Sequence, residues 1–161
     1  MLGYQVSGLG QVEPLQQETN YTCSAASLLA VLGHYGVDGW TEETLARVIG
    51  ATEKVGATPE QIVDAAHSLG LQAFKGTFVS LAQAKQFTDQ DVPLIALVHS
   101  FVSPGKCHFV VVTKIGDSSV ELMDPNVDGN VRVLSSANMV SRWTVNGHMD
   151  AVVVSAPWAS R

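Results

Sequence analysis

Hydrophobic residues recur at helical spacing through the first half of the chain. Leu28, Leu29 and Leu32 share one side of the segment 23–35, and Gly36 ends it. Residues 1–22 look irregular. We predict helices over 23–35, 41–49, 59–69 and a short segment after Ser80. The third has the clearest start, because Thr58 and Gln61 can form a capping box and Pro59 occupies the first helical position.

The pattern changes after Pro93 to runs of β-branched residues separated by Gly, Asp, Asn and Ser. Strands are predicted over 94–98, 109–113, 120–123, 131–134 and 151–154. Helices in the first half and strands in the second favour an α+β fold with a mostly antiparallel sheet. No repeat, low-complexity tract or linker interrupts the chain, so we expect a single domain over 1–161.

Composition narrows the classes of function. The 161 residues are 46% hydrophobic and 15% charged, which is typical of a globular protein. A net charge of −6 argues against nucleic-acid or anionic-membrane binding. No apolar run approaches 18 residues, so no membrane span is expected. Two cysteines do not make a disulfide framework, which favours a reducing, cytoplasmic compartment.

Cys23 stands at the predicted start of the first helix. An isolated cysteine is usually a small buried hydrophobe, but a helix N-terminus stabilises a thiolate through its free N–H groups. Thr22 is expected to cap this helix. Gln17 precedes Cys23 by six residues, and its side-chain amide could donate to an oxyanion formed at the thiol. The pair indicates a thiol acyl-transfer enzyme.

His108 is the best histidine partner for this thiol. It begins a predicted strand, so its ring would project from one end of a rigid sheet. His34 is expected instead to be a surface residue that compensates the dipole at the far end of the first helix. Structural roles are expected for the other three, His67, His99 and His148.

Asp124 is placed by the symmetry of a predicted hairpin. Asp124 and His108 are each eight residues from Gly116, in the turn 115–119. In an antiparallel pair they would be near neighbours, with Cβ atoms roughly 5 Å apart. A carboxylate there could orient the imidazole towards the thiol as the third member of a triad. Asp117, Asp128 and Asp150 lack this symmetry.

Cys107 is not expected to join the site. Strand neighbours point to opposite faces, so Cys107 would face away if His108 faces Cys23. A zinc site that uses Cys23, Cys107 and His108 is disfavoured for the same reason, and no CxxC or HxxxH spacing is present. We therefore expect neither a metal nor another cofactor.

Together these motifs resemble the bacteriocin-processing, double-glycine leader peptidases, a branch of the papain-like cysteine peptidases. The resemblance covers roughly residues 12–154. It rests on the Gln17-to-Cys23 spacing, the run CSAASL at 23–28, the run HFVV at 108–111 and the pair Asp124-Pro125. Segments 41–49 and 58–74 resemble the two helical segments of the family, and 92–96 resembles its central strand.

The resemblance implies a papain-like fold and a role for each site residue. Cys23 would be the nucleophile, His108 the general base and acid, Asp124 the orienting residue and Gln17 the oxyanion donor. The substrate would be a peptide or protein cleaved after a Gly-Gly pair. Ser24 stands where the family usually has Gly, and its side chain would crowd the thiol.

Two alternatives stay open at this point. The same protease fold could be the toxic domain of a secreted bacterial effector that cuts a protein in the target-cell cytoplasm. A cognate immunity protein would then be its partner. The chain ends soon after its last predicted strand without a hydrophobic continuation, which favours a free enzyme or a toxin domain over a transporter fragment. The second alternative is a peptide-binding module without activity.

Overall fold

The computed structural model describes residues 12, 22–54, 56–101, 105–125 and 130–155. Within these residues the helices are α1 (Cys23–His34), α2 (Glu42–Ile49), α3 (Pro59–Ser68), α4 (Leu81–Thr88) and α5 (Ser136–Trp143). The strands are β1 (Gln72–Phe78), β2 (Leu94–His99), β3 (Cys107–Ile115), β4 (Ser119–Asp124), β5 (Asn130–Ser135), β6 (Thr144–Val145) and β7 (His148–Ser155).

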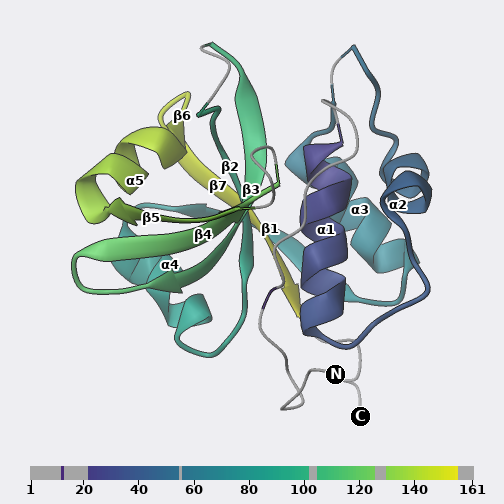
Figure 1. The fold of residues 1–161 in the computed structure, drawn as a ribbon, viewed down its shortest axis with the longest axis horizontal. Coiled ribbons are helices and arrows are strands. Elements are labelled where there is room, and N and C mark those ends of the chain that lie inside the picture. Colours follow the sequence, from purple (N-terminus) through teal and green to yellow (C-terminus); the bar gives the residue numbers. More distant parts are fainter. Residues whose placement is uncertain (1–11, 13–21, 55, 102–104, 126–129, 156–161) are drawn as a thin grey trace.

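The strands form one antiparallel sheet in the order β1-β7-β2-β3-β4-β5, and β6 pairs with β7. Figure 1 shows α1, α2 and α3 on one side of this sheet and α4 and α5 on the other. We call the side with α1, α2 and α3 the helical side, and the side with α4 and α5 the sheet side. The α+β architecture predicted from the sequence is confirmed.

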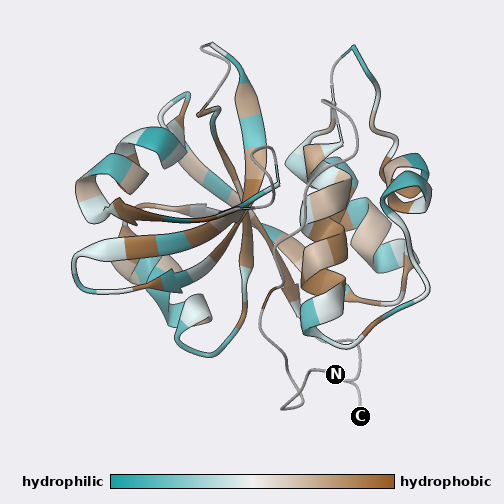
Figure 2. Cartoon of the chain, viewed as in Figure 1, coloured by the Kyte–Doolittle hydropathy of each residue, from teal (hydrophilic) through white to brown (hydrophobic). Residues whose placement is uncertain are grey.

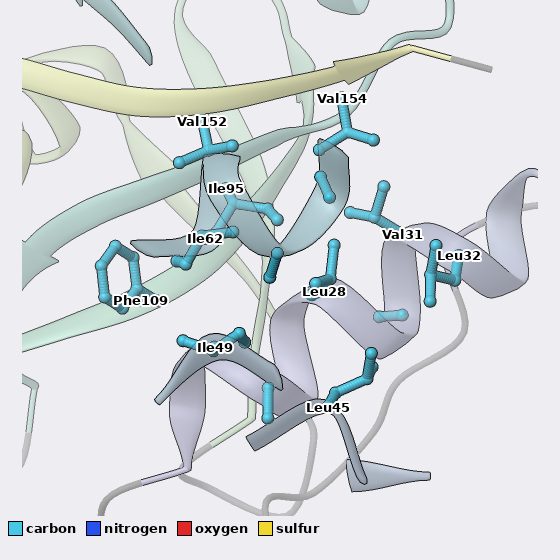
Figure 3. Packing of buried hydrophobic residues seen from close by; sticks show 14 of the residues in the cluster. Leu28, Val31, Leu32, Leu45, Ile49, Ile62, Ile95, Phe109, Val152 and Val154 are labelled. Atoms are coloured by element: carbon cyan, nitrogen blue, oxygen red, sulfur yellow. The ribbon is translucent and has the colours of Figure 1, made fainter. Parts of the chain in front are cut away.

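Each side has its own apolar core. On the helical side, residues of α1 to α3 such as Leu28, Leu45 and Ile62 pack against Phe109 and Val152 of the sheet (Figure 3). On the sheet side, Leu94, Val110 and Leu122 pack with residues of α4 and α5. Hydrophobic residues accordingly gather along the strands and α1, while hydrophilic residues are frequent on α2 and α5 (Figure 2). The inner strands β2, β3, β4 and β7 are therefore mostly buried on both faces.

The predicted capping signals form as expected in the later helices. The Thr58 hydroxyl accepts from Gln61 N at 3.2 Å, and the Gln61 side chain accepts from Thr58 N at 2.8 Å. The Ser80 hydroxyl likewise accepts from Gln83 N at the start of α4. These bonds satisfy amide groups that have no partner within the helix.

Three elements depart from the sequence prediction. The segment 58–74 does not stay helical, because β1 begins at Gln72 and pairs with β7 along its whole length. The side chains of β1 are mostly exposed. The strand was missed because its sequence lacks the run of β-branched residues that marks the inner strands. The helix α5 and the short β6 interrupt the succession of strands. The Ser135 hydroxyl caps α5 by accepting from Asn138 N.

Candidate active site

Cys23 lies where α1 meets the start of β3. It is the first residue of α1 and is half-buried. The backbone N–H of Phe109 donates to Cys23 Sγ at 3.5 Å, and the Ser27 hydroxyl donates to the carbonyl of Phe109 at 3.4 Å. These two bonds join the first turn of α1 to the residue that follows His108. The sulfur is thus held beside the histidine by contacts that a single strand residue supplies.

The prediction that Thr22 caps α1 is wrong. Thr22 has the N-cap position, but its side chain makes no capping bond. The hydroxyl instead donates to the carboxylate of Glu42, a buried residue in the first turn of α2. Two hydrogen bonds compete for the Thr22 side chain. Donating to a charged carboxylate is stronger than accepting from a backbone N–H of α1, so the bond to Glu42 forms instead of the cap. This bond ties the beginnings of α1 and α2 together.

His108 and Asp124 form a buried hydrogen-bonded pair. His108 Nε2 donates to Asp124 Oδ1 at 2.6 Å, and the two side chains are 6% and 1% exposed. The bond commits Nε2 to the carboxylate and leaves Nδ1 for the sulfur, with which the imidazole also interacts. Cys23, His108 and Asp124 therefore lie in series, as the sequence predicts.

The predicted hairpin symmetry is wrong in its register. Val111 pairs with Met123 and Val112 with Leu122, so β4 is shifted by two residues from a hairpin centred on Gly116. Continued, this register puts Asp124 across from Val110 instead of His108. A shift of two residues keeps a side chain on the same face. Asp124 consequently reaches His108 along the diagonal, and the predicted contact forms.

A β-bulge at Thr113 makes this contact possible. Beyond the bulge, Lys114 pairs with Glu121 and Ile115 with Val120. This register differs by one residue from the register of Val111 and Val112. That register, continued without the bulge, would put Asp124 across from Val111, on the opposite face from His108. The burial of β3 side chains reflects the bulge. Val112 and Ile115 are buried in the same core three residues apart, which a regular strand does not allow.

The charge state of His108 follows from its neighbours. Burial is the largest single influence on its pKa and lowers it, while the hydrogen bonds to Asp124 and Cys23 and the charges of both side chains raise it. Their sum outweighs burial and raises the pKa from 6.5 to about 9. At neutral pH the ring is an imidazolium. It can pair with a thiolate and supply a proton to a leaving amine.

Arg132 is part of this constellation, and sequence reasoning missed it. Its Nε donates to Asp124 Oδ2 at 3.2 Å. The signal available in the sequence was an arginine between two valines. In the structure Arg132 pairs with Leu122 of β4. Gln17 and Asp128 lie outside the described residues. Of the other aspartates considered, Asp150 accepts from the Thr77 hydroxyl.

His34 is not the surface residue that the sequence predicted. It is 3% exposed, and its Nε2 bonds the carbonyl of Asp91 at 3.0 Å. The end of α1 is covered by the turn that follows α4, so helix position alone gave the wrong environment. His67 and His99 bond the carbonyls of Ala73 and Thr144. Such contacts fit structural roles.

The remaining polar groups near Cys23 add little to this picture. Cys107 is exposed, and both cysteines are free thiols. Ser24 is fully buried, so its side chain does not crowd the thiol from the solvent side.

Across the described residues, no three His, Cys, Asp or Glu side chains are grouped closely enough to bind a metal ion. The described helices include none of the length and apolarity needed to cross a membrane.

Known proteins share this architecture. The chain is similar in fold to the peptidase domain of Streptococcus ComA, a bifunctional ABC transporter of a quorum-sensing pathway. The TM-score is 0.74 at 21% identity, over 91% of this chain and 99% of that one. A double glycine motif protease from an AMS/PCAT transporter, solved with a leader peptide, gives 0.69 at 20% identity, over 92% and 94%. A C39-like peptidase from Bacillus anthracis gives 0.70 at 16% identity, over 89% and 94%.

The sequence comparisons give the family. A search of curated protein sequences found no significant match. The model of the peptidase C39 family, by contrast, matches residues 11–149. This match spans most of the chain and includes Cys23, His108 and Asp124. The papain-like α+β fold is therefore that of a cysteine protease, and the chain belongs to the peptidase C39 family.

Proposed function

We propose that this protein is an endopeptidase that cleaves after a Gly-Gly pair in a peptide or protein substrate. The observation that carries the proposal is the series formed by Cys23, His108 and Asp124, with Sγ at a helix start and the imidazole held by a buried carboxylate. This is the arrangement that thiolate attack on a carbonyl requires.

The reaction begins with the thiolate of Cys23. It attacks the scissile carbonyl, and the electron pair of the C=O bond moves onto the oxygen. The oxyanion collapses, the C–N bond breaks, and the His108 imidazolium gives its proton to the departing amine. The products of this half-reaction are a thioester on Cys23 and a free amine. A water molecule then loses its proton to His108, attacks the thioester and releases the acid.

Two residues assist these steps in the proposal. Asp124 holds the imidazole by Nε2 and favours its charged form. Gln17 donates its side-chain amide to the oxyanion, a role assigned from the family resemblance. On this proposal, Gln17→Ala lowers the rate by roughly 10²–10³, the usual effect of losing one oxyanion donor. Near-normal turnover in that variant would remove Gln17 from the mechanism.

Specificity for glycine is supported by the comparisons. One of the similar structures is a double glycine motif protease in complex with a leader peptide. Ser24, which replaces the glycine usual after the nucleophile, is buried in this chain and so leaves the surface around the thiol free for substrate. A peptide backbone without side chains could then approach Sγ closely.

The test is cleavage of matched peptides. A 20-residue peptide with a central Gly-Gly pair is compared with versions in which either glycine is alanine, and the products are identified by mass spectrometry. We expect cleavage after the second glycine of the parent peptide, a large loss with either alanine, and no cleavage by Cys23→Ala. Equal cleavage of all three peptides would overturn the Gly-Gly specificity. Failure of an electrophilic epoxide to label Cys23 at neutral pH would overturn the thiol mechanism.

A further inference from the structure

Two arginines lie against one phenylalanine beside the His108–Asp124 pair. Phe101 follows β2, and the guanidinium carbons of Arg132 and Arg142 are each 4.6 Å from the centre of its ring. The chain has only four arginines and a net charge of −6, so this pairing of cations is not a general feature of its surface. We call these three side chains the Arg-Phe-Arg cluster.

Arg132 and His108 hold the Asp124 carboxylate from two sides. His108, on β3, donates to Oδ1, and Arg132, on β5, donates to Oδ2. The strand β4 that carries Asp124 lies between these two strands. Because each oxygen has its own charged donor, rotation of the carboxylate about its last bond would break both contacts. The carboxylate plane is thus fixed with Oδ1 towards the imidazole.

The cluster also restrains Arg132 itself. A long side chain loses rotamer freedom when it is held in one geometry, and Arg132 is 29% exposed. Stacking on Phe101 restrains the guanidinium before it meets Asp124. Arg142 contacts the same ring, and its own guanidinium donates to the carbonyl of Ser100 at 2.8 Å. The segment after β2 and the helix α5 therefore both support the position of Arg132.

We propose that Arg132, restrained by the Arg-Phe-Arg cluster, is a positioning residue that aligns Asp124 with His108 and keeps the carboxylate charged. The inference rests on the proposed peptidase mechanism and extends it to a fifth side chain. Arginine suits the position better than lysine, because a planar guanidinium can stack on the ring and direct Nε at the carboxylate at the same time.

The charges around Asp124 give the inference a distinct signature. His108 faces the carboxylate from β3 and Arg132 from β5. Arg142 of α5 also lies over the ring of Phe101, and Cys23 of α1 interacts with the imidazole. Removing the positive charge of Arg132 makes protonation of the carboxylate easier. The acid limb of the pH–activity profile should then move to higher pH, which a purely structural role would not cause.

The experiment compares Arg132→Met, Arg132→Lys and Phe101→Leu with the control Arg47→Met in the full chain. Arg47 forms an exposed salt bridge with Glu43 on α2. Two readouts are taken across pH 5–10: kcat and KM on a Gly-Gly peptide, and the rate at which iodoacetamide alkylates Cys23. Alkylation reports the thiolate–imidazolium pair without any substrate, so failure of the cleavage proposal would leave this test intact.

We expect Arg132→Met to lower kcat at least 10-fold with KM within about twofold, and to move the acid limbs of both readouts to higher pH. Arg132→Lys should keep the wild-type acid limbs and recover part of kcat. Phe101→Leu, which leaves every charge in place, should lower kcat several-fold. Arg47→Met should match the wild type.

If Arg132→Met folds, either of two results would overturn the inference. One is an Arg132→Met variant that matches Arg47→Met in both readouts. The other is an equal loss of kcat in Arg132→Met and Arg132→Lys with unmoved acid limbs, which would make the role of Arg132 structural. If Arg132→Met does not fold, as judged by its circular dichroism, Arg132→Lys and Phe101→Leu decide. Wild-type kcat in both of these variants would also overturn it.

Discussion

The two sides of the molecule position their parts of the site by different physical means. On the helical side, Cys23 depends on how α1 packs, through an apolar core and two bonds to Phe109. On the sheet side, His108 and Asp124 depend on strand register and on charged hydrogen bonds that reach Arg132. The helical side supplies one atom, the sulfur of Cys23, whereas the sheet side supplies the hydrogen-bonded network of His108, Asp124 and Arg132.

This difference predicts different responses to mutation. On the proposed mechanism, loss of the sulfur should remove the reaction, because Sγ is the attacking atom. Loss of one member of the network leaves the others in place, so the sheet side should fail by degrees. The predictions below test this contrast, from the largest expected effect to the smallest.

Cys23→Ala should abolish turnover and keep the fold. Loss of the nucleophile from a catalytic triad lowers kcat on the order of 10⁶-fold. The side chain is half-buried and small, so the protein should stay folded, with a modest fall in thermal midpoint from the loss of its contacts with Phe109 and His108. Turnover of the Gly-Gly peptide and a thermal melt check the two parts. Residual turnover within 10³-fold of the wild type would mean that another group attacks the substrate.

Asp124→Asn should leave a partly active enzyme. Asparagine keeps the shape but not the charge, and loss of the orienting carboxylate in a triad lowers kcat on the order of 10⁴-fold. The alkaline limb of kcat, which we expect near pH 9 in the wild type, should move towards 6.5 because one cause of the raised His108 pKa is gone. A pH profile of kcat measures both effects. An alkaline limb that stays near pH 9 would separate Asp124 from the titration of His108.

The stability of the fold should depend on pH through the sheet side. The pKa of His108 is about 9 in the folded state and 6.5 unfolded, so its stabilisation is complete below pH 6.5 and is lost as pH rises through 9. Over this window the wild type should lose up to about 3 kcal/mol relative to His108→Gln. Urea unfolding at several pH values measures the difference. In Cys23→Ala the loss should be smaller, since Cys23 contributes to the raised pKa.

The same contrast explains what the sequence could predict. Local signals were sufficient for where the helices of the helical side begin, since Thr58 and Gln61 form the predicted capping box and Cys23 begins the predicted helix. Asp124 was found through a hairpin symmetry that proved wrong by two residues. The predicted contact forms because a register error of two residues keeps the Asp124 side chain on the same face of the sheet as His108. The bulge at Thr113 makes the error two residues instead of three.

Long-range contacts were the part that sequence could not supply. Thr22 and Glu42 are 20 residues apart, at the starts of two different helices, and no sequence spacing predicts the bond between them. The contact between Arg132 and Phe101 depends on where the segment after β2 lies. His34 was misjudged for the same reason, since the turn that buries it comes from residues near Asp91.

Thr22→Val tests the long-range anchor of the helical side. Removing the hydroxyl leaves the buried Glu42 carboxylate with one donor fewer, which costs about 1–3 kcal/mol of the free energy of unfolding. The control is Glu43→Gln, which removes an exposed i,i+4 pair worth less than about 0.5 kcal/mol. Urea unfolding distinguishes them. Equal stabilities of the two variants would show that the Thr22–Glu42 bond does not anchor α1.

Ser24→Ala should have the smallest effect and the opposite sign. The Ser24 hydroxyl is buried and has no hydrogen-bond partner among the described residues, whereas both ring and carboxylate of the sheet-side pair are bonded. Alanine removes this unpaired group and has the higher helix propensity, so the variant should be up to about 1 kcal/mol more stable by urea unfolding. Turnover should stay within about twofold of the wild type. A large fall in turnover would instead mean that the hydroxyl acts on Cys23, and that the helical side, like the sheet side, controls its reactive atom through a polar contact.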